Sequence, residues 1–436
     1  MDYTPTFELG GYAEVRTAYA VGVEGVPWNL YERVRPSFKI APAERLTAEA
    51  VVEASVAQGR DGVGEAITLI EASELGPIMG QAGCSYSEAA RYTAVSDYLS
   101  VERLHVDFNL PSMDLSLGRQ ALRWGSGLVF HPTDIYSEVL VTEPWREPQG
   151  VNAFKANLPM GEGGIVGVLA VDDDLSGLYP GKKGTFAGVP ASGAVRATVR
   201  AVDTDFTGVG IVKSDGELFG GVDLRGTLGV GWWVEGGYHA RAATLQDTLG
   251  VNYLETVVGA DYSFSVLQML YVAAEYRYDG SGAEPDDYSF VQRLGGGDSV
   301  EISCVDGMPD PADSGYTITP DLSSATSGGT TRATLGRHYV DGAVRLTVNN
   351  DVSISTSAVF NVMDGTGVLI PDAAFNVGER VAVHVGAQIP VGKDGEFNPD
   401  TSDLTVHVSG AGVNASADLS GLVPVATAQA WLRYSF

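Results

Sequence analysis

The chain has 436 residues, and its 55 acidic side chains outnumber its 27 Lys and Arg, which gives a formal net charge of −28. This balance argues against a nucleic-acid partner, because nucleic-acid binding requires clustered basic residues. No run of about 18 apolar residues occurs, so the sequence excludes a membrane-spanning helix. A closed β-barrel, the other fold that satisfies its own backbone in lipid, stays open.

Period-two patterns begin near the N-terminus. Predicted strands cover residues 7–19, 31–40 and 46–56, and in each of them apolar side chains alternate with polar or charged ones, as Ala48 and Glu49 do. Successive side chains of a strand point to opposite faces, so each segment has one apolar and one polar face. The many Ala and Gly on the apolar face favour a lipid-facing surface over the packed interior of a soluble sheet.

The alternation continues down the chain, and no long helical period competes with it. Two stretches, 164–172 and 205–214, differ because they are apolar on both faces. The alternating segments are 103–108, 195–201, 217–225, 232–241, 270–279, 344–348 and 380–388.

The connections between these segments predict the topology. Short turns, such as 41–44 and 226–229, alternate with connections that are longer on average, with tight exceptions near 214–216 and 364–365. Short periplasmic turns and long extracellular loops are typical of outer-membrane barrels. We therefore predict one domain over residues 1–436, an all-β transmembrane antiparallel barrel of about 18 strands, with 16 as the alternative. Its longest extracellular loops are 59–96, 125–149, 279–335 and 391–423.

Charged residues on the polar faces are expected to line the lumen, because a charge facing lipid at the membrane midplane costs about 2–4 kcal/mol. Both signs occur there, and Arg is well represented. The predicted lumen-facing arginines are Arg16, Arg33, Arg35, Arg103, Arg196, Arg200, Arg225, Arg277, Arg345, Arg380 and Arg433.

The acid excess lies mainly in the long loops, at 172–174, 284–321 and 394–403. Solvated loops kept soluble by charge are one interpretation. The other is an acidic vestibule that concentrates cations, or weakly bound divalent cations that bridge loops or lipopolysaccharide. No EF-hand spacing occurs. We expect no resident cofactor and no structural metal, with such weakly bound cations as the alternative.

The segment 117–136 combines Gly-Arg-Gln, Trp-Gly and Pro-Thr-Asp, and strict alternation breaks at Gly118, where a bulge or an early exit from the membrane is expected. This run resembles a motif of porin-like outer-membrane proteins of proteobacteria, over about 40 residues. In general porins the third loop folds inward and narrows the pore. By that analogy the constriction candidates are Arg119, Arg123, Asp134, Glu138, Glu143, Arg146 and Glu147; an exposed loop with surface charges is the alternative.

Cys84 and Cys304 are the only cysteines, and they fall in the two longest predicted loops. Both loops would face an oxidising exterior, where a disulfide persists. A bridge that pins the loops together over the mouth is expected, and two separate thiols are the alternative. No CxxC or Cys/His spacing suggests a zinc site.

No enzymatic constellation stands out among the histidines. His131 and Asp134 form the nearest local pair, which a polar loop contact explains. Neither a phosphate loop, nor a nucleophile elbow, nor a metal-ligand cluster occurs. We therefore expect a protein that is not an enzyme.

The last strand alternates from Ala426 to the terminal residue, and its apolar face ends in Leu432, Tyr434 and Phe436. It resembles the last strand of Gram-negative outer-membrane barrels, which in that family is the signal read by the barrel-assembly machinery. The strand is expected to pair with the 7–19 segment and to place Phe436 on the lipid side. Met1 and Asp2 open without an apolar signal segment, which suggests a mature sequence with an added Met.

The resemblance and the pattern together predict a porin of the bacterial outer membrane for diffusion of small hydrophilic solutes, set in lipid and lipopolysaccharide. A homo-oligomer or a periplasmic partner would be compatible with it. The alternative is a barrel that exports a polymer or scaffolds a surface complex with protein partners.

Overall fold

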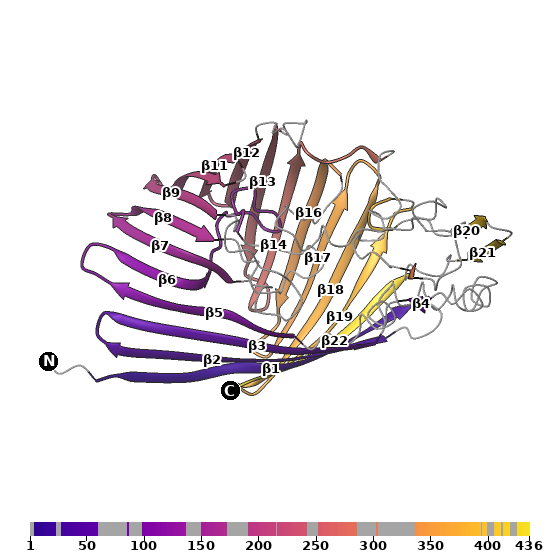
Figure 1. The fold of residues 1–436 in the computed structure, drawn as a ribbon, viewed down its shortest axis with the longest axis horizontal. Coiled ribbons are helices and arrows are strands. Elements are labelled where there is room, and N and C mark those ends of the chain that lie inside the picture. The colour runs from indigo at the N-terminus through magenta and orange to yellow at the C-terminus, as the bar shows by residue number, and fades with distance from the viewer. Residues whose placement is uncertain are drawn as a thin grey trace.

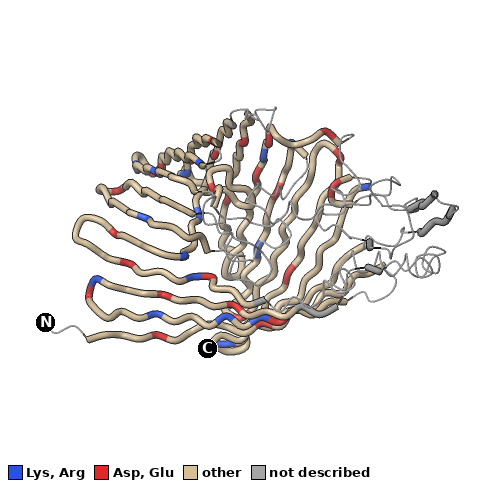
Figure 2. Tube along the Cα trace, in the orientation of Figure 1, with Lys and Arg blue, Asp and Glu red and all other residues tan. Residues whose placement is uncertain are grey.

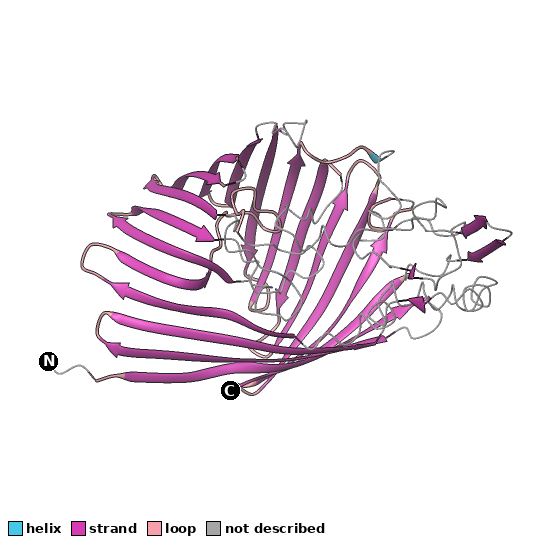
Figure 3. Ribbon diagram, viewed as in Figure 1, coloured by secondary structure: helices cyan, strands magenta, loops and turns pink. Residues whose placement is uncertain are grey.

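The computed structural model describes residues 4–22, 28–59, 85–86, 98–136, 150–171, 191–214, 216–241, 252–285, 302–303, 336–393, 395–398, 405–410, 413–418 and 425–436. The described chain is almost entirely strand and connecting turn (Figure 3). Within these residues no helix has both the length and the apolar character needed to cross a membrane.

One sheet of 18 strands forms a closed wall (Figure 1). Consecutive strands pair antiparallel, and β1 pairs with β2 on one side and with β22 on the other, so the sheet has no free edge. The strands are β1 (Thr6–Val21), β2 (Trp28–Ala43), β3 (Leu46–Gly59), β5 (Tyr98–Asn109), β6 (Asp114–Ala121), β7 (Gly150–Met160), β8 (Gly163–Val171), β9 (Ala191–Ala201), β10 (Thr204–Lys213), β11 (Glu217–Thr227), β12 (Gly231–Arg241), β13 (Asn252–Phe264), β14 (Met269–Asp279), β16 (His338–Thr347), β17 (Val352–Asn361), β18 (Thr366–Val377), β19 (Val381–Val391) and β22 (Ala426–Ser435).

The strand number and the closure agree with the sequence prediction. The 205–214 stretch forms β10, and the barrel therefore has 18 strands and not 16. Leu432 stands opposite Val15 in the β1–β22 pair, and the Phe436 N–H donates to the Gly11 carbonyl at 3.0 Å. Two further strand pairs lie outside the wall: β4 (Ser85–Tyr86) with β15 (Ile302–Ser303), and β20 (Thr405–Gly410) with β21 (Val413–Asp418).

Connection lengths differ between the two ends of the barrel. At the end where β1 begins and β22 ends, every connection between wall strands has at most four residues, as at 44–45, 161–162 and 202–203. At the other end most connections are longer, and the tight exceptions are 214–216 and 362–365. We call these the short-turn end and the long-loop end.

The two faces of the wall differ as the alternation predicts. On β22, Leu432 is 46% exposed on the outward face, whereas Gln429 on the inward face is 7% exposed. Outward aromatic side chains such as Phe7, Phe38 and Phe436 lie near the short-turn end, as expected for an interfacial girdle. Figure 2 shows acidic and basic residues along strands all around the wall.

The irregularity expected at Gly118 takes another form. The β5–β6 register runs through Gly118 without a shift. Gly118 has a φ of 123°, and a Cβ there would lie 2.2 Å from the Leu104 carbonyl oxygen, so the position requires glycine. Register shifts occur in other strand pairs. Between β3 and β5, Val51 faces Arg103, Val52 faces Val101, and Glu102 is the extra residue. Between β2 and β3 the register shifts from Ile40 to Ala43.

Candidate functional site

After Ala121 the chain leaves the wall and runs over its inward face; we call residues 122–136 the inner segment. Leu122 and Trp124 are buried against inward side chains of β7 to β11, among them Val168, Ile211 and Phe219. This contact explains why the stretches 164–172 and 205–214 are apolar on both faces, since one face meets the outside and the other meets the inner segment.

The second half of the inner segment packs farther round the wall. Phe130 is buried in a cluster with Trp233 of β12, Val257 of β13 and Tyr339 of β16. Arg277 of β14 lies over the Phe130 ring, with its guanidinium carbon 4.4 Å from the ring centroid. The inner segment thus spans the inward face from β7 to β16.

Glu275 of β14 accepts hydrogen bonds from three consecutive backbone N–H groups of the inner segment. Leu128 donates to Oε2 at 2.6 Å, while Val129 and Phe130 donate to Oε1 at 3.2 and 3.1 Å. The indole Nε1 of Trp233 donates to Oε2 at 2.6 Å, and Glu275 is 3% exposed. The Glu275 carboxylate on β14 therefore accepts the backbone hydrogen bonds that a neighbouring strand would accept in a sheet.

Glu235 of β12 holds the residues on either side of that stretch. Its Oε2 accepts from the N–H of Ser126 at 3.1 Å and of Gly127 at 3.2 Å. Its Oε1 accepts from the Thr133 N–H at 2.6 Å and hydroxyl at 2.7 Å. The Ser126 hydroxyl donates to Asp223 of β11. Glu235 is fully buried.

Beside this contact lies a buried charge cluster centred on Arg277. Arg277 donates to Asp279 at 2.9 Å and approaches Glu255 at 3.5 Å. Asp341 of β16 stands directly opposite Glu275 and is 2% exposed. Among the described residues neither of its buried carboxylate oxygens has a hydrogen-bond partner.

The inward face of β22, β1, β2 and β3 has a different composition, and we call it the arginine wall. Glu14 lies between two arginines, accepting from Arg33 at 2.9 Å and from Arg433 at 2.6 Å. Arg33 also approaches Glu53 at 3.5 Å. Arg35 lies 4.0 Å from the same carboxylate.

Aromatic rings alternate with these guanidinium groups. Arg33 and Arg433 both lie over Tyr12, at 5.3 and 4.4 Å from its centroid. Arg16 lies 5.5 Å over the Trp431 ring, and His384 of β19 stacks parallel to that ring at 4.5 Å. Such cation–π contacts hold the planar guanidinium groups in a fixed orientation.

The predicted constriction residues fall in different places. Arg119 stands opposite Leu104, which is outward and 58% exposed, so the register places Arg119 on the outward side and not on the lumen wall. Arg123 and Asp134 belong to the inner segment. Glu138, Glu143, Arg146 and Glu147 lie outside the described residues.

Arg123 and Asp134 both contact His131 of the inner segment. The Arg123 guanidinium lies 3.4 Å from His131 Nε2, and the Asp134 N–H donates to the His131 carbonyl at 2.9 Å. Burial lowers the pKa of His131 to about 4, and the Arg123 charge adds to this shift. Because a guanidinium N–H can only donate, it requires an unprotonated Nε2, in agreement with that pKa.

Among the predicted lumen-facing arginines, Arg380 differs from the expectation. It lies in the 378–380 turn, because β18 ends at Val377, and its Nη1 donates to the outward Tyr434 hydroxyl at 3.4 Å. The register places the others on the inward face: Arg16, Arg33, Arg35, Arg103, Arg196, Arg200, Arg225, Arg277, Arg345 and Arg433.

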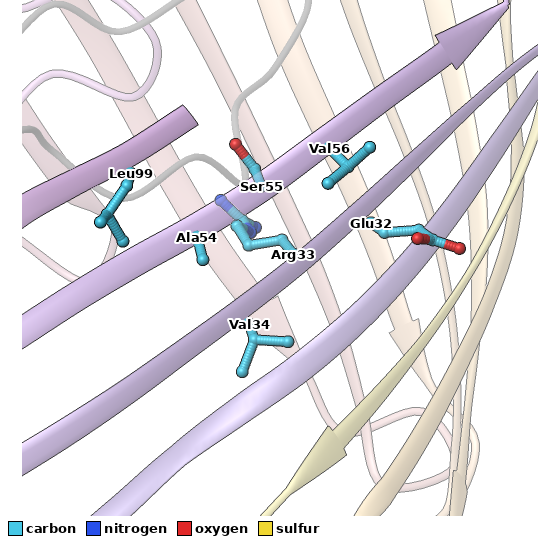
Figure 4. Close-up of a pocket in the computed structure, with 7 residues that line it drawn as sticks. All are labelled: Glu32, Arg33, Val34, Ala54, Ser55, Val56 and Leu99. Carbon is cyan, nitrogen blue, oxygen red and sulfur yellow. The ribbon is translucent and has the colours of Figure 1, made fainter. Parts of the chain in front are cut away.

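A groove of about 350 Å³ lies on the other side of the arginine wall (Figure 4). Outward side chains of three neighbouring strands line it: Val34 of β2, Ala54 and Val56 of β3, and Leu99 of β5. Because these side chains share the outward face, the groove belongs to the outer surface and not to the lumen.

Other predicted features are only partly described. Cys84 and Cys304 lie outside the described residues, as do most of the acidic loop positions. Of the described loop acids, Glu284 pairs with Arg337 at 2.8 Å, and Glu396 accepts from the Tyr339 hydroxyl at 2.6 Å. Within the described part of the chain, no three His, Cys, Asp or Glu are placed to hold a metal ion.

The sequence matches no protein-family model and no curated protein. The fold is similar to three solved structures from Pseudomonas aeruginosa. OccK5 (OpdH) gives a TM-score of 0.52 at 7% identity, covering 98% of both chains. The outer membrane protein OprD gives 0.51 at 8%, covering 98% of this chain and 94% of its own. OpdK with vanillate gives 0.51 at 8%, covering 98% of both. The shared fold confirms the predicted outer-membrane type of barrel.

Proposed function

We propose that this protein is a channel of the bacterial outer membrane through which small hydrophilic solutes diffuse, and that the inner segment narrows its water-filled lumen. The observation that carries the proposal is a closed 18-strand barrel with a chain segment fixed to the inward face of its wall. A barrel of this width encloses more space than its own side chains fill. A segment on the inner wall therefore narrows the lumen without filling it.

The outward face supports the membrane location. Large apolar side chains on every second strand position are exposed, as with Leu9, Val15 and Leu432. Such a band needs lipid to cover it. Leu432, Tyr434 and Phe436 share this outward face at the end of the chain, which fits recognition of the last strand by the barrel-assembly machinery.

The inward face supports passage of polar solutes. Charges of both signs face each other on the arginine wall, and fixed dipoles and charges order water and disfavour apolar solutes. OpdK, which shares the fold, was solved with vanillate. We include vanillate among the solutes to be tested, because the guanidinium groups over Tyr12 and Trp431 offer positive charge beside flat rings.

Liposome swelling tests the proposal. Purified, folded protein is reconstituted, and swelling is followed in iso-osmotic neutral sugars of increasing size and in vanillate. We expect rapid swelling with small sugars, a decline with size, and permeation of vanillate. Absence of swelling with every one of these solutes would contradict the channel. If the protein also copurifies with a periplasmic partner, an export or scaffold barrel is favoured.

A further inference from the structure

We infer that Glu235 and Glu275 are positioning residues that act as a clasp for the inner segment, so that these two wall carboxylates set the width of the pore. The inference rests on the proposed channel function and adds to it a mechanism for fixing the narrowing. The two carboxylates hold the 126–133 stretch of the inner segment, beside the apolar contacts that Leu122, Trp124 and Phe130 make with the wall.

The backbone N–H groups of the inner segment find most of their acceptors on the wall. Five consecutive N–H groups, those of residues 126–130, and the Thr133 N–H all donate to the two carboxylates. Within the described residues, the backbone–backbone hydrogen bond of this segment runs from the Asp134 N–H to the His131 carbonyl. A buried N–H without an acceptor is costly, so losing one carboxylate leaves several donors unsatisfied at once.

Hydrogen bonds, and not ion pairs, are the polar contacts of Glu235 and Glu275. Among the described residues neither Glu235 nor Glu275 lies within ion-pair distance of a cation, although both are buried. Each of the four carboxylate oxygens instead accepts at least one N–H of the inner segment, as in other backbone sites that bind anions. The segment thus supplies the hydrogen bonds that these buried carboxyl groups would otherwise lack.

Two glycines of the inner segment lie against the clasp with no room for a side chain. Gly125 has a φ of 85°, and a Cβ there would lie 2.6 Å from Glu235 Oε1. A Cβ on Gly127 would lie 1.9 Å from the Phe130 carbonyl oxygen and 3.2 Å from Glu275 Oε2. A side chain at either position would push the backbone away from the carboxylates.

The experiment measures hydrogen exchange of the amides 126–130 and 133 together with single-channel conductance in a planar bilayer. The variants are Glu275→Gln, Glu235→Gln and both combined. An amide replaces one acceptor by a donor, which then faces backbone N–H groups. We expect exchange of these amides to accelerate by about tenfold or more, because bonds to charged groups are lost. Conductance should increase in the same variants.

Glu217→Gln is the matched control. Glu217 is inward on β11 of the same wall and pairs with Lys213 and His239. It accepts none of the six hydrogen bonds that join residues 126–130 and 133 to the clasp. This variant should leave exchange of the segment amides and conductance at wild-type values. Gly127→Ala is the variant that changes no wall residue, and it should release the segment even where the double variant does not fold.

Wild-type protection of the segment amides in both the double variant and Gly127→Ala would overturn the clasp. So would faster exchange in the control to the same extent as in Glu275→Gln. Absence of conductance in the wild type would contradict the channel, and the exchange measurement would still decide whether the clasp exists.

Discussion

The two sides of the lumen use inward carboxylates for opposite purposes. On β12 and β14, Glu235 and Glu275 bind backbone N–H groups of the chain itself. On the arginine wall, Glu14 and Glu53 bind guanidinium groups of neighbouring strands. The first arrangement attaches a segment to the wall, and the second joins wall strands to one another. An inward acid in such a barrel therefore cannot be assigned a role from its face alone.

The largest effect is expected where the arginine wall crosses the β1–β22 closure. Glu14→Ala removes the carboxylate that Arg33 and Arg433 share, leaving buried positive charge without its main partner. We expect the free energy of unfolding in urea to fall by about 3–5 kcal/mol. Glu8→Ala, an exposed position on the same strand, is the control and should change it by less than about 0.5 kcal/mol. Equal losses in the two variants would show that Glu14 does not hold the closure.

A disulfide is predicted to link the loops that leave the two sides. The β4–β15 pair joins the connection after β3 to the connection after β14, with Ser85 opposite Ser303. Cys84 precedes Ser85 and Cys304 follows Ser303 in the sequence, and both cysteines lie outside the described residues. We expect reductant to slow the protein on a denaturing gel, to expose two titratable thiols, and to lower the free energy of unfolding by about 2–4 kcal/mol. Two titratable thiols before reduction would contradict the bridge.

Two Asp→Asn substitutions in the cluster around Arg277 are expected to change the free energy of unfolding in opposite directions. Asp279 accepts from Arg277 and from the Ser281 N–H at 2.9 Å, so Asp279→Asn should destabilise the barrel by about 1.5–3 kcal/mol. Asp341 has no hydrogen-bond partner among the described residues and stands opposite Glu275, so Asp341→Asn should raise the stability by about 1 kcal/mol. Urea titration of both variants checks this. A loss of stability in Asp341→Asn would mean that its charge is needed there.

The inner segment is also expected to respond to pH. His131 has a pKa of about 4 when buried and 6.5 when free, so the attached segment takes up fewer protons than the released one between these values. Attachment is therefore strongest above pH 6.5 and weakens as the pH falls towards 4. We expect protection of the segment amides, relative to wall amides, to decrease over this range, and His131→Gln to abolish the decrease. A decrease that persists in the variant would assign it to another group.

The strands were predictable from the sequence because lipid and lumen impose opposite polarity on every second residue, as Ala48 and Glu49 show. The same alternation placed Arg119 on the outward face, and the porin-like motif wrongly favoured the lumen. Arg380 was misplaced because alternation does not reveal where β18 ends and the turn begins.

The clasp could not be predicted, because Glu235 and Glu275 occupy inward positions of alternating strands just as Glu14 does. Their partners lie more than 100 positions away in the sequence, and only the folded wall brings them together. One signal was present. The stretches 164–172 and 205–214 are apolar on both faces, which indicates that something apolar covers the inward side.

Single-channel recording of the folded wild-type protein in a planar bilayer tests the channel most directly. We predict discrete conductance steps in symmetric salt, with a reversal potential under a salt gradient that reports the ion selectivity of the lumen. A barrel that is folded and inserted but gives no steps would contradict the account, because its lumen would then be closed to ions.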